Sequence, residues 1–248
     1  MWLIDQPFGV FEEPTDEGLS PQQQEALWQT VQSKAHPDGT VAFSYCSYES
    51  HPAAFTKQAE AVRKVRQSPG SAVPLVAKEF PFVFVPNNLH KSPRPVSMTP
   101  LDMCKPLFFA HTDSDVAGFH THLEYSPDSN WAGNLLQGYS KTGPERAGAV
   151  QVQKPVSLAI ELILRYTNPH DLVVVPFAGT GSEVLAALYT GRRVVAFEKD
   201  TERFLSCRSR VEDLLGKFAS ETGPKPRFRF PNVRRPYHWL CQQTHVQL

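Results

Sequence analysis

The sequence predicts an α/β fold with a mostly parallel sheet and helices on both faces. Three features of residues 172–200 carry this prediction. A continuous apolar run, Leu172–Val175, indicates a strand buried on both faces. A glycine-rich turn and a helical stretch follow it, and a second apolar run at Val194–Phe197, expected to be buried too, ends at the acidic residue Glu198. Strand, turn, helix and strand in this order form a βαβ unit, whose two strands lie parallel.

Residues 1–110 predict short strands and helices that are more widely spaced along the chain. We expect strands at Trp2–Ile4, 40–46, 80–85 and 107–110, and helices at about 22–33 and 53–66. Ser20 and Pro21 suit the N-cap and first position of the first helix, and Ser68-Pro69-Gly70 ends the second. Residues 111–150 are polar and weakly patterned, which predicts a long connection.

The last third predicts three helices around the two strands of the βαβ unit. The helix at 156–166 is expected to be amphipathic, with Leu158, Leu162 and Ile163 on one face. A second helix at about 183–190 follows the glycine-rich turn, and a third at 201–218 closes the folded part.

Composition and charge exclude several classes of protein. The chain has 248 residues, and its 25 Lys and Arg balance its 25 Asp and Glu, which argues against polyanion binding through overall charge. No apolar run reaches the roughly 18 residues of a membrane-spanning helix, and the first residues lack the basic and apolar segments of a secretory signal. The four cysteines form no C-x-x-C pair, and the histidines have no metal-ligand spacing. We therefore expect an intracellular protein with unpaired thiols and no metal site.

The glycine-rich turn predicts a ligand site. Its residues, Phe177-Ala178-Gly179-Thr180-Gly181-Ser182, lie between a strand and a helix, where backbone N–H groups point outward and glycine lets a ligand approach. Glu198 lies 19 residues beyond Gly179, at the place where an acidic residue binds ribose hydroxyls. The turn has no lysine for phosphates, so a nucleoside without a pyrophosphate fits better than a dinucleotide, and S-adenosylmethionine is the commonest such cofactor. The alternative is a turn that only lets helix and strand pack.

A series of motifs resembles the DNA amino-methyltransferases of the N4-cytosine and N6-adenine type. The family's K-P, D-P-F-x-G-x-G-T and E-x-D motifs are matched in order by Lys154-Pro155, Val175–Ser182 and Glu198-Lys199-Asp200. Asp5-Gln6-Pro7-Phe8 is similar to the catalytic D-P-P-Y motif, which comes first in one permuted arrangement of the family. The resemblance extends from Trp2 to about Arg210.

This resemblance implies a Rossmann-like, S-adenosylmethionine-dependent methyltransferase fold with permuted motif order, acting on a base of DNA or RNA that is flipped out of its stack. Asp5 and the backbone carbonyl of Gln6 would accept hydrogen bonds from the base's amino group. Pro7 completes the catalytic motif, and Phe8 would stack on the base. The implied cofactor-binding residues are Lys154, Pro155, Pro176, Phe177, Ala178, Gly179, Gly181, Ser182 and Glu198.

Two positions depart from the family pattern. Gln6 replaces the first proline of the catalytic motif, which removes proline's fixed φ from that loop. Val175 replaces an acid near the cofactor, and losing one charge interaction is expected to weaken cofactor binding by roughly 1–3 kcal/mol. An alternative is therefore a catalytically inactive subunit of a larger, ribonucleoprotein assembly. A third interpretation is methylation of a small molecule or of a protein glutamine, which related sites with an N-P-P-Y motif carry out. Asp5 argues against it, because it stands where that motif has asparagine.

The C-terminal tail has a different composition from the rest of the chain. Residues 222–248 contain no Asp or Glu, and their aromatic residues alternate with five basic candidates for nucleic-acid contact: Lys225, Arg227, Arg229, Arg234 and Arg235. Such a tail suits single-stranded nucleic acid or a protein partner. The family's usual segment before the catalytic motif has no counterpart ahead of Asp5. We expect that residues 228–233 replace its strand, that the sheet lacks an edge strand, or that the chain is shortened, and an incomplete sheet would invite a protein partner.

The predicted organisation is one methyltransferase-like domain followed by the tail. The domain covers residues 1–218, with a catalytic half at 1–110, a loop or recognition insert at 111–150 and a cofactor-binding half at 151–218. The tail covers residues 219–248.

Overall fold

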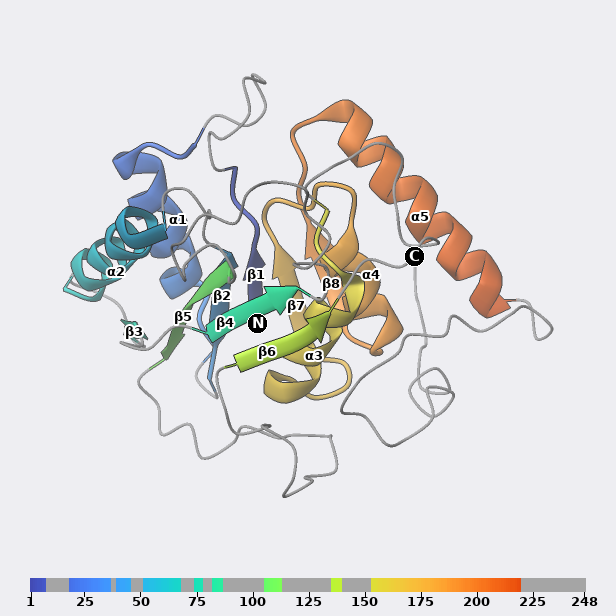
Figure 1. Cartoon of the computed structure of the whole chain (residues 1–248), viewed down its shortest axis with the longest axis horizontal. Helices are drawn as coiled ribbons and strands as arrows, with labels where there is room; N and C mark the ends of the chain where they lie inside the picture. Colours follow the sequence, from blue (N-terminus) through green and yellow to red (C-terminus); the bar gives the residue numbers. More distant parts are fainter. Residues whose placement is uncertain are drawn as a thin grey trace, which may run out of the picture. The chain divides into compact units, whose positions relative to one another are not determined.

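The computed structural model describes residues 1–7, 18–36, 39–45, 51–67, 74–77, 82–86, 105–112, 135–139 and 153–219 (Figure 1). The chain divides into two compact units. The N-terminal unit comprises Trp2–Gly118 and Ala132–Gln137, and the C-terminal unit comprises Met1, Phe119–Trp131 and Gly138–Leu248. Each unit combines helices with strands, which confirms the predicted α/β class.

The N-terminal unit is built on a mixed sheet. Its strands lie in the order β6-β4-β5-β2-β1, and β3 also pairs with β5. Their bounds are β1 Trp2–Ile4, β2 Val41–Tyr45, β3 Leu75–Ala77, β4 Phe82–Pro86, β5 Lys105–Thr112 and β6 Leu135–Tyr139. β1 runs parallel to β2, whereas β2, β3 and β4 all pair antiparallel with β5. Strands β3 and β6 were not predicted from the sequence, and β6 lies within residues 111–150, which were expected to form a connection.

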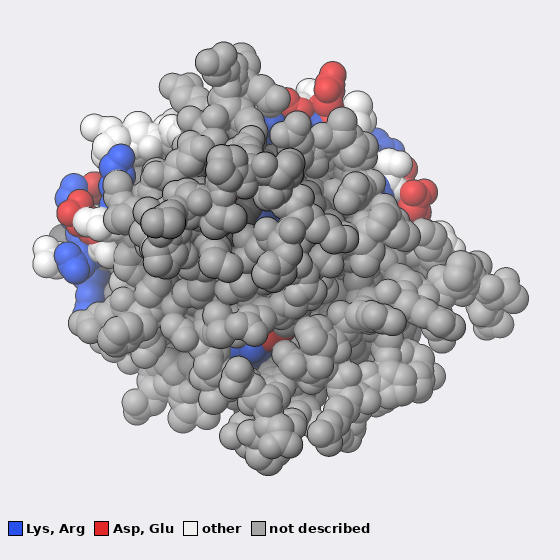
Figure 2. Space-filling view, in the orientation of Figure 1, with Lys and Arg blue, Asp and Glu red and all other residues white. Residues whose placement is uncertain are grey.

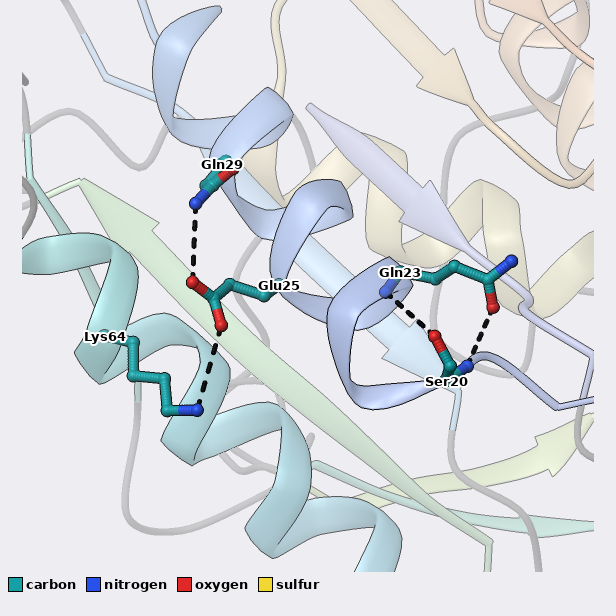
Figure 3. A network of polar contacts seen from close by, with 5 residues as sticks. All are labelled: Ser20, Gln23, Glu25, Gln29 and Lys64. Carbon is teal, nitrogen blue, oxygen red and sulfur yellow. Dashed lines mark hydrogen bonds and ion pairs between the residues drawn. The ribbon is translucent and has the colours of Figure 1, made fainter.

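Two helices pack together in this unit, α1 (Pro21–Ser33) and α2 (His51–Arg66). A capping box starts α1 (Figure 3). The backbone N–H of Gln23 donates to the Ser20 hydroxyl at 3.2 Å, and the backbone N–H of Ser20 donates to the side-chain oxygen of Gln23 at 2.8 Å. The fully buried Trp28 of α1 meets the ring of Phe108 edge-on, with centroids 5.4 Å apart. At the surface, Lys64 of α2 pairs with Glu25 of α1 at 3.7 Å (Figure 3).

A buried glutamine joins three elements of the same unit. The amide nitrogen of Gln32 on α1 donates to the carbonyl of Val65 on α2 at 2.9 Å, and its oxygen accepts the N–H of Leu75 on β3 at 3.1 Å. The side chain therefore satisfies two backbone groups that would otherwise be buried without partners. Gln32 shares the buried face of α1 with Trp28 and Val31, but the backbone groups that it binds belong to other elements and are not indicated by the sequence of α1.

The C-terminal unit contains the predicted βαβ arrangement. Its elements are α3 (Val156–Tyr166), β7 (Leu172–Val175), α4 (Ser182–Tyr189), β8 (Arg193–Ala196) and α5 (Thr201–Ala219). β7 and β8 are parallel, with Val173 opposite Val194. The carbonyl of Met1 accepts the N–H of Val174 at 2.9 Å, so β7 is hydrogen-bonded to Met1 as well as to β8.

Helix α3 is amphipathic in sequence, as predicted, and its polar residues Ser157, Glu161 and Arg165 are buried along with its apolar ones, the last two as an ion pair. Two predictions of burial in this unit are wrong. Strand β7 is buried at Val173 and Val175, but Leu172 is 40% exposed. Strand β8 is not buried, because Val195 is 44% exposed and Phe197, just beyond the strand, is 59% exposed. Composition does not reveal these differences, since an element's burial depends on how many neighbours cover it.

The described surface carries charges of both signs. Helix α2 exposes Lys57, Arg63, Lys64 and Arg66, and Figure 2 shows blue side chains with some red ones at this edge of the molecule. Basic residues in the last turn of α2 complement the helix dipole. Within the described ranges, no helix is long and apolar enough to cross a membrane, and no three His, Cys, Asp or Glu side chains gather into a metal site.

We expect Gln32→Ala to lower the free energy of unfolding by about 2–4 kcal/mol, because it leaves the Val65 carbonyl and the Leu75 amide buried and unpaired. The matched control is Gln29→Ala, which removes an exposed side chain with one long bond to Glu25 and should cost less than ~0.5 kcal/mol. Urea denaturation of both variants measures the difference, and equal losses would contradict the bridging role of Gln32.

Candidate functional site

The site lies where the chain leaves the carboxyl ends of β7 and β8. Beyond these strands the two segments stay hydrogen-bonded, because the Phe197 amide donates to the Val175 carbonyl at 2.9 Å and the Ala178 amide donates to the Phe197 carbonyl at 2.8 Å. The glycine-rich turn and Glu198 therefore emerge side by side. Open α/β sheets bind ligands at this end of their strands.

Two glycines of the turn adopt backbone conformations that favour glycine, for different reasons. Gly179 has φ +52°, and a Cβ built on it would meet no atom of the described residues within 4 Å, so these residues leave space beside this backbone. Gly181 has φ +88° and is the N-cap of α4, and its Cβ would lie 2.5 Å from the buried Sγ of Cys207. The first glycine leaves room for a ligand, and the second lets α4 and α5 pack closely.

Glu198 organises the turn. Its Oε2 accepts the N–H of Gly179 at 2.6 Å, and its Oε1 accepts the N–H of Asp200 at 2.9 Å. The carboxylate thus ties the glycine-rich turn to the start of α5. An ionised carboxylate has about four acceptor positions, so two backbone bonds leave capacity for hydroxyl donors of a ligand.

The remaining predicted cofactor residues gather around the same turn. The Ser182 hydroxyl donates to the carbonyl of Lys154 at 2.9 Å, which fixes the segment before α3 against the start of α4. Pro155 is buried as the N-cap residue of α3. Pro176 and Phe177 are half-buried, and Ala178 is buried.

Two residues of α5 support the turn and were not among the predicted site residues. Arg210 donates from one Nη to both the carbonyl and the hydroxyl of Thr180. Cys207 lies one helical turn earlier, and its burial, together with Glu183 and Glu198, raises the pKa of its thiol, although Arg210 acts to lower it. The spacing of 207 and 210 places both on one face of α5, and this was the signal available in the sequence.

Val175, which stands where the family has an acid, belongs to the apolar core. It is fully buried at the end of β7 and lies opposite Ala196 of β8. This position therefore supplies no carboxylate to the turn.

The predicted catalytic residues belong to the N-terminal unit, directly after β1. Asp5 and Pro7 are half-buried, and Gln6 is buried with 8% of its surface exposed. Phe8 lies outside the described residues, as do the predicted nucleic-acid contacts Lys225, Arg227, Arg229, Arg234 and Arg235.

Comparison with known families identifies the chain. The model of the N6/N4 methyltransferase family, described as DNA methylase, matches residues 77–207, which is more than half of the chain. The chain belongs to the N6/N4 DNA methylase family. The match includes the glycine-rich turn, Glu198 and Cys207, and it does not include Asp5–Phe8.

Individual relatives agree with the family. Type II methyltransferase M.HinfI of Haemophilus influenzae is 29% identical over 96 residues, covering 38% of this chain and 27% of the relative. Type II methyltransferase M2.DpnII of Streptococcus pneumoniae is 32% identical over 82 residues, covering 33% of this chain and 29% of the relative. The chain therefore aligns with less than a third of the length of either relative.

Solved methyltransferases share the fold. The M1.HpyAVI–SAM complex superposes with a TM-score of 0.61 at 18% identity, covering 85% of this chain and 87% of that chain. The cytosine-N4-specific PvuII DNA methyltransferase gives a TM-score of 0.51 at 15% identity, covering 87% and 84%. These similarities confirm the predicted methyltransferase fold of this family member.

We expect Gly181→Ala to lower the free energy of unfolding by about 2–4 kcal/mol, because it adds both a clash with Cys207 and a left-handed backbone strain. Gly216→Ala is the matched control within α5, where an added Cβ meets nothing within 4 Å, and it should stabilise by roughly 0.5–1 kcal/mol. Thermal and urea unfolding measure both. A Gly181→Ala protein as stable as wild type would show that the close approach of α5 is not real.

Proposed function

We propose that this chain is an S-adenosylmethionine-dependent methyltransferase that acts on an exocyclic amino group of a DNA base. The observation that carries the proposal is the hydrogen bond of Glu198 to Gly179, which holds an acidic side chain beside a glycine-rich turn with open space. The family match and the SAM complex of a similar solved methyltransferase support the cofactor, and the family's description as DNA methylase supports DNA over RNA.

The residues of the turn fit this cofactor. The open space at Gly179 lets the ligand approach the backbone, and the remaining acceptor positions of Glu198 suit the two hydroxyls of its ribose. The Lys154–Ser182 hydrogen bond keeps the family's K-P segment at the start of α4, where the methionine part is expected. S-adenosylmethionine, when bound, would supply an electrophilic methyl group on a sulfonium, whose sulfur is the leaving group.

The catalytic motif prepares the base for this reaction. The Asp5 carboxylate and the Gln6 backbone carbonyl would accept hydrogen bonds from the amino group and so make its nitrogen lone pair available for methylation. The Asp5 carboxylate would also take up the proton that the nitrogen loses. The contribution of these residues is mainly positioning.

Strand β8 supports a further proposal about partners. Among the described strands, only β7 pairs with β8. Val195 of β8, Phe197 just beyond it, and Phe204 and Leu205 of α5 are apolar residues that are 44–59% exposed. Such an edge is a template for strand pairing, so it is a candidate surface for a protein partner. The inactive-subunit alternative gains no support from the comparisons, since the matched family consists of methylases.

Glu198→Gln should weaken S-adenosylmethionine binding about 10- to 100-fold in isothermal titration calorimetry, because it removes the charge that strengthens hydrogen bonds to ribose. Glu202→Gln is the matched control, since Glu202 is an exposed acid in the first turn of α5 and should leave Kd unchanged. If the two variants bind the cofactor equally well, Glu198 does not hold it.

Asp5→Ala should abolish methyl transfer to DNA while leaving the affinity for S-adenosylmethionine within about twofold of wild type. Transfer of a tritiated methyl group to unmodified DNA measures the first effect, and calorimetry measures the second. Wild-type protein that binds the cofactor but methylates no DNA or RNA would overturn the enzymatic proposal. Undiminished transfer by Asp5→Ala would overturn only the role of Asp5.

A further inference from the structure

The outer edge of β8 presents backbone groups to whatever lies beside it. The N–H groups of Arg193 and Phe197, at the two ends of the strand, donate to carbonyls of the segment that contains β7, at 3.0 and 2.9 Å. Consecutive residues of a strand direct their N–H and C=O groups to opposite sides, so those of Val194 and Ala196 face away from β7. Within the described residues no strand lies on that side. An edge of this kind is a template for a further strand.

Large apolar side chains accompany this edge. Val195, Phe197, Phe204 and Leu205 are 44–59% exposed, and all four lie in the stretch of chain that leads from β8 into the first turns of α5. Exposed apolar side chains that gather in one part of a molecule mark a surface that another segment covers. The occupant of the edge therefore has to supply both strand pairing and apolar side chains.

The chain's own tail contains a segment with both properties. Residues 227–230, Arg-Phe-Arg-Phe, lie outside the described ranges and alternate basic and aromatic side chains with the period of two that is typical of a strand. Pro226 precedes this run and Pro231 follows it, and proline is confined to the margins of strands. The prolines thus limit the run to the four-residue length of β8.

The connection to this segment has the length that a parallel strand requires. Parallel neighbours are joined by a crossover of a dozen or more residues, usually a helix. Helix α5 follows β8 as α4 follows β7 (Figure 1). The 19 residues of α5 rise about 28 Å, which exceeds the length of β8 by roughly 15 Å. Residues 220–227 can span up to about 26 Å when extended, so they cover this excess.

We propose that residues 227–230 add to the outer edge of β8 as a parallel strand, through a second βαβ crossover formed with α5. The new strand pairs with the outward N–H and C=O groups of β8. Phe228 and Phe230 share one face of it and cover the exposed side chains of Val195 and Phe197. The proposal assigns the edge, described above as a candidate surface for a protein partner, to the chain itself, and it does not rest on the proposed enzymatic function.

Amide hydrogen exchange of the full-length protein, resolved by residue with NMR, tests the proposal. The N–H of Ala196 faces away from β7 and should exchange slowly in wild type, because a carbonyl of the tail accepts it. In the double variant Phe228→Asp/Phe230→Asp it should exchange at least about 10-fold faster. The N–H of Val195 faces β7 and should stay equally protected in both proteins. Wild-type protein whose Ala196 N–H exchanges as fast as that of an open strand would overturn the proposal.

Tyr237→Asp/Trp239→Asp is the matched control, because it places the same two charges on aromatic positions further along the tail. It should leave the exchange of Ala196 unchanged, and equal acceleration by both double variants would show that residues 227–230 are not the occupant. Phe230→Ala replaces the first variant if that protein unfolds, with an expected acceleration of about 3-fold or more.

Light scattering at several protein concentrations separates the tail from other occupants. Protection of Ala196 that persists in a monomer on dilution supports the tail. Protection that survives Phe228→Asp/Phe230→Asp and disappears as a dimer dissociates would assign the edge to a second copy instead, and so contradict the proposal. None of these measurements involves the cofactor or DNA, so their outcome is independent of whether the chain is a methyltransferase.

Discussion

The carboxylate of Glu198 joins the two segments that leave the parallel strands of the C-terminal unit. It accepts one N–H from Gly179 and another from Asp200, so the glycine-rich turn and the start of α5 are fixed to the same side chain. Charge-assisted bonds to backbone N–H groups are stronger than neutral ones. The turn is further supported from α5 by Arg210 at Thr180 and by the close packing of Cys207 on Gly181. The ligand site is therefore held in shape by the protein itself.

Val175 is fully buried at the position where the resemblance to the family predicts an acid, so this position supplies no charge beside the turn. The catalytic motif departs from the pattern too, because Gln6 stands where the related motif has proline and therefore lacks proline's fixed φ.

The features predicted correctly from sequence are local ones. The apolar run at Leu172–Val175, the glycines after it and Glu198 each carry their signal within a few residues, so the βαβ unit and its turn could be predicted. The features that were missed depend on distant neighbours. Strand β3 is three residues long and exists through its pairing with β5, and the burial of Gln32 depends on α2 and β3. The exposure of β8 likewise depends on what pairs with its outer edge, which its own composition does not encode.

Amide hydrogen exchange with and without S-adenosylmethionine tests the central claim most directly. If the cofactor binds against the turn that Glu198 organises, exchange should slow in peptides covering residues 176–182 and 197–200, and peptides from α2 should exchange at the same rate in both states. Saturating cofactor that leaves the exchange of these turn segments unchanged, while protecting another part of the chain, would contradict the account.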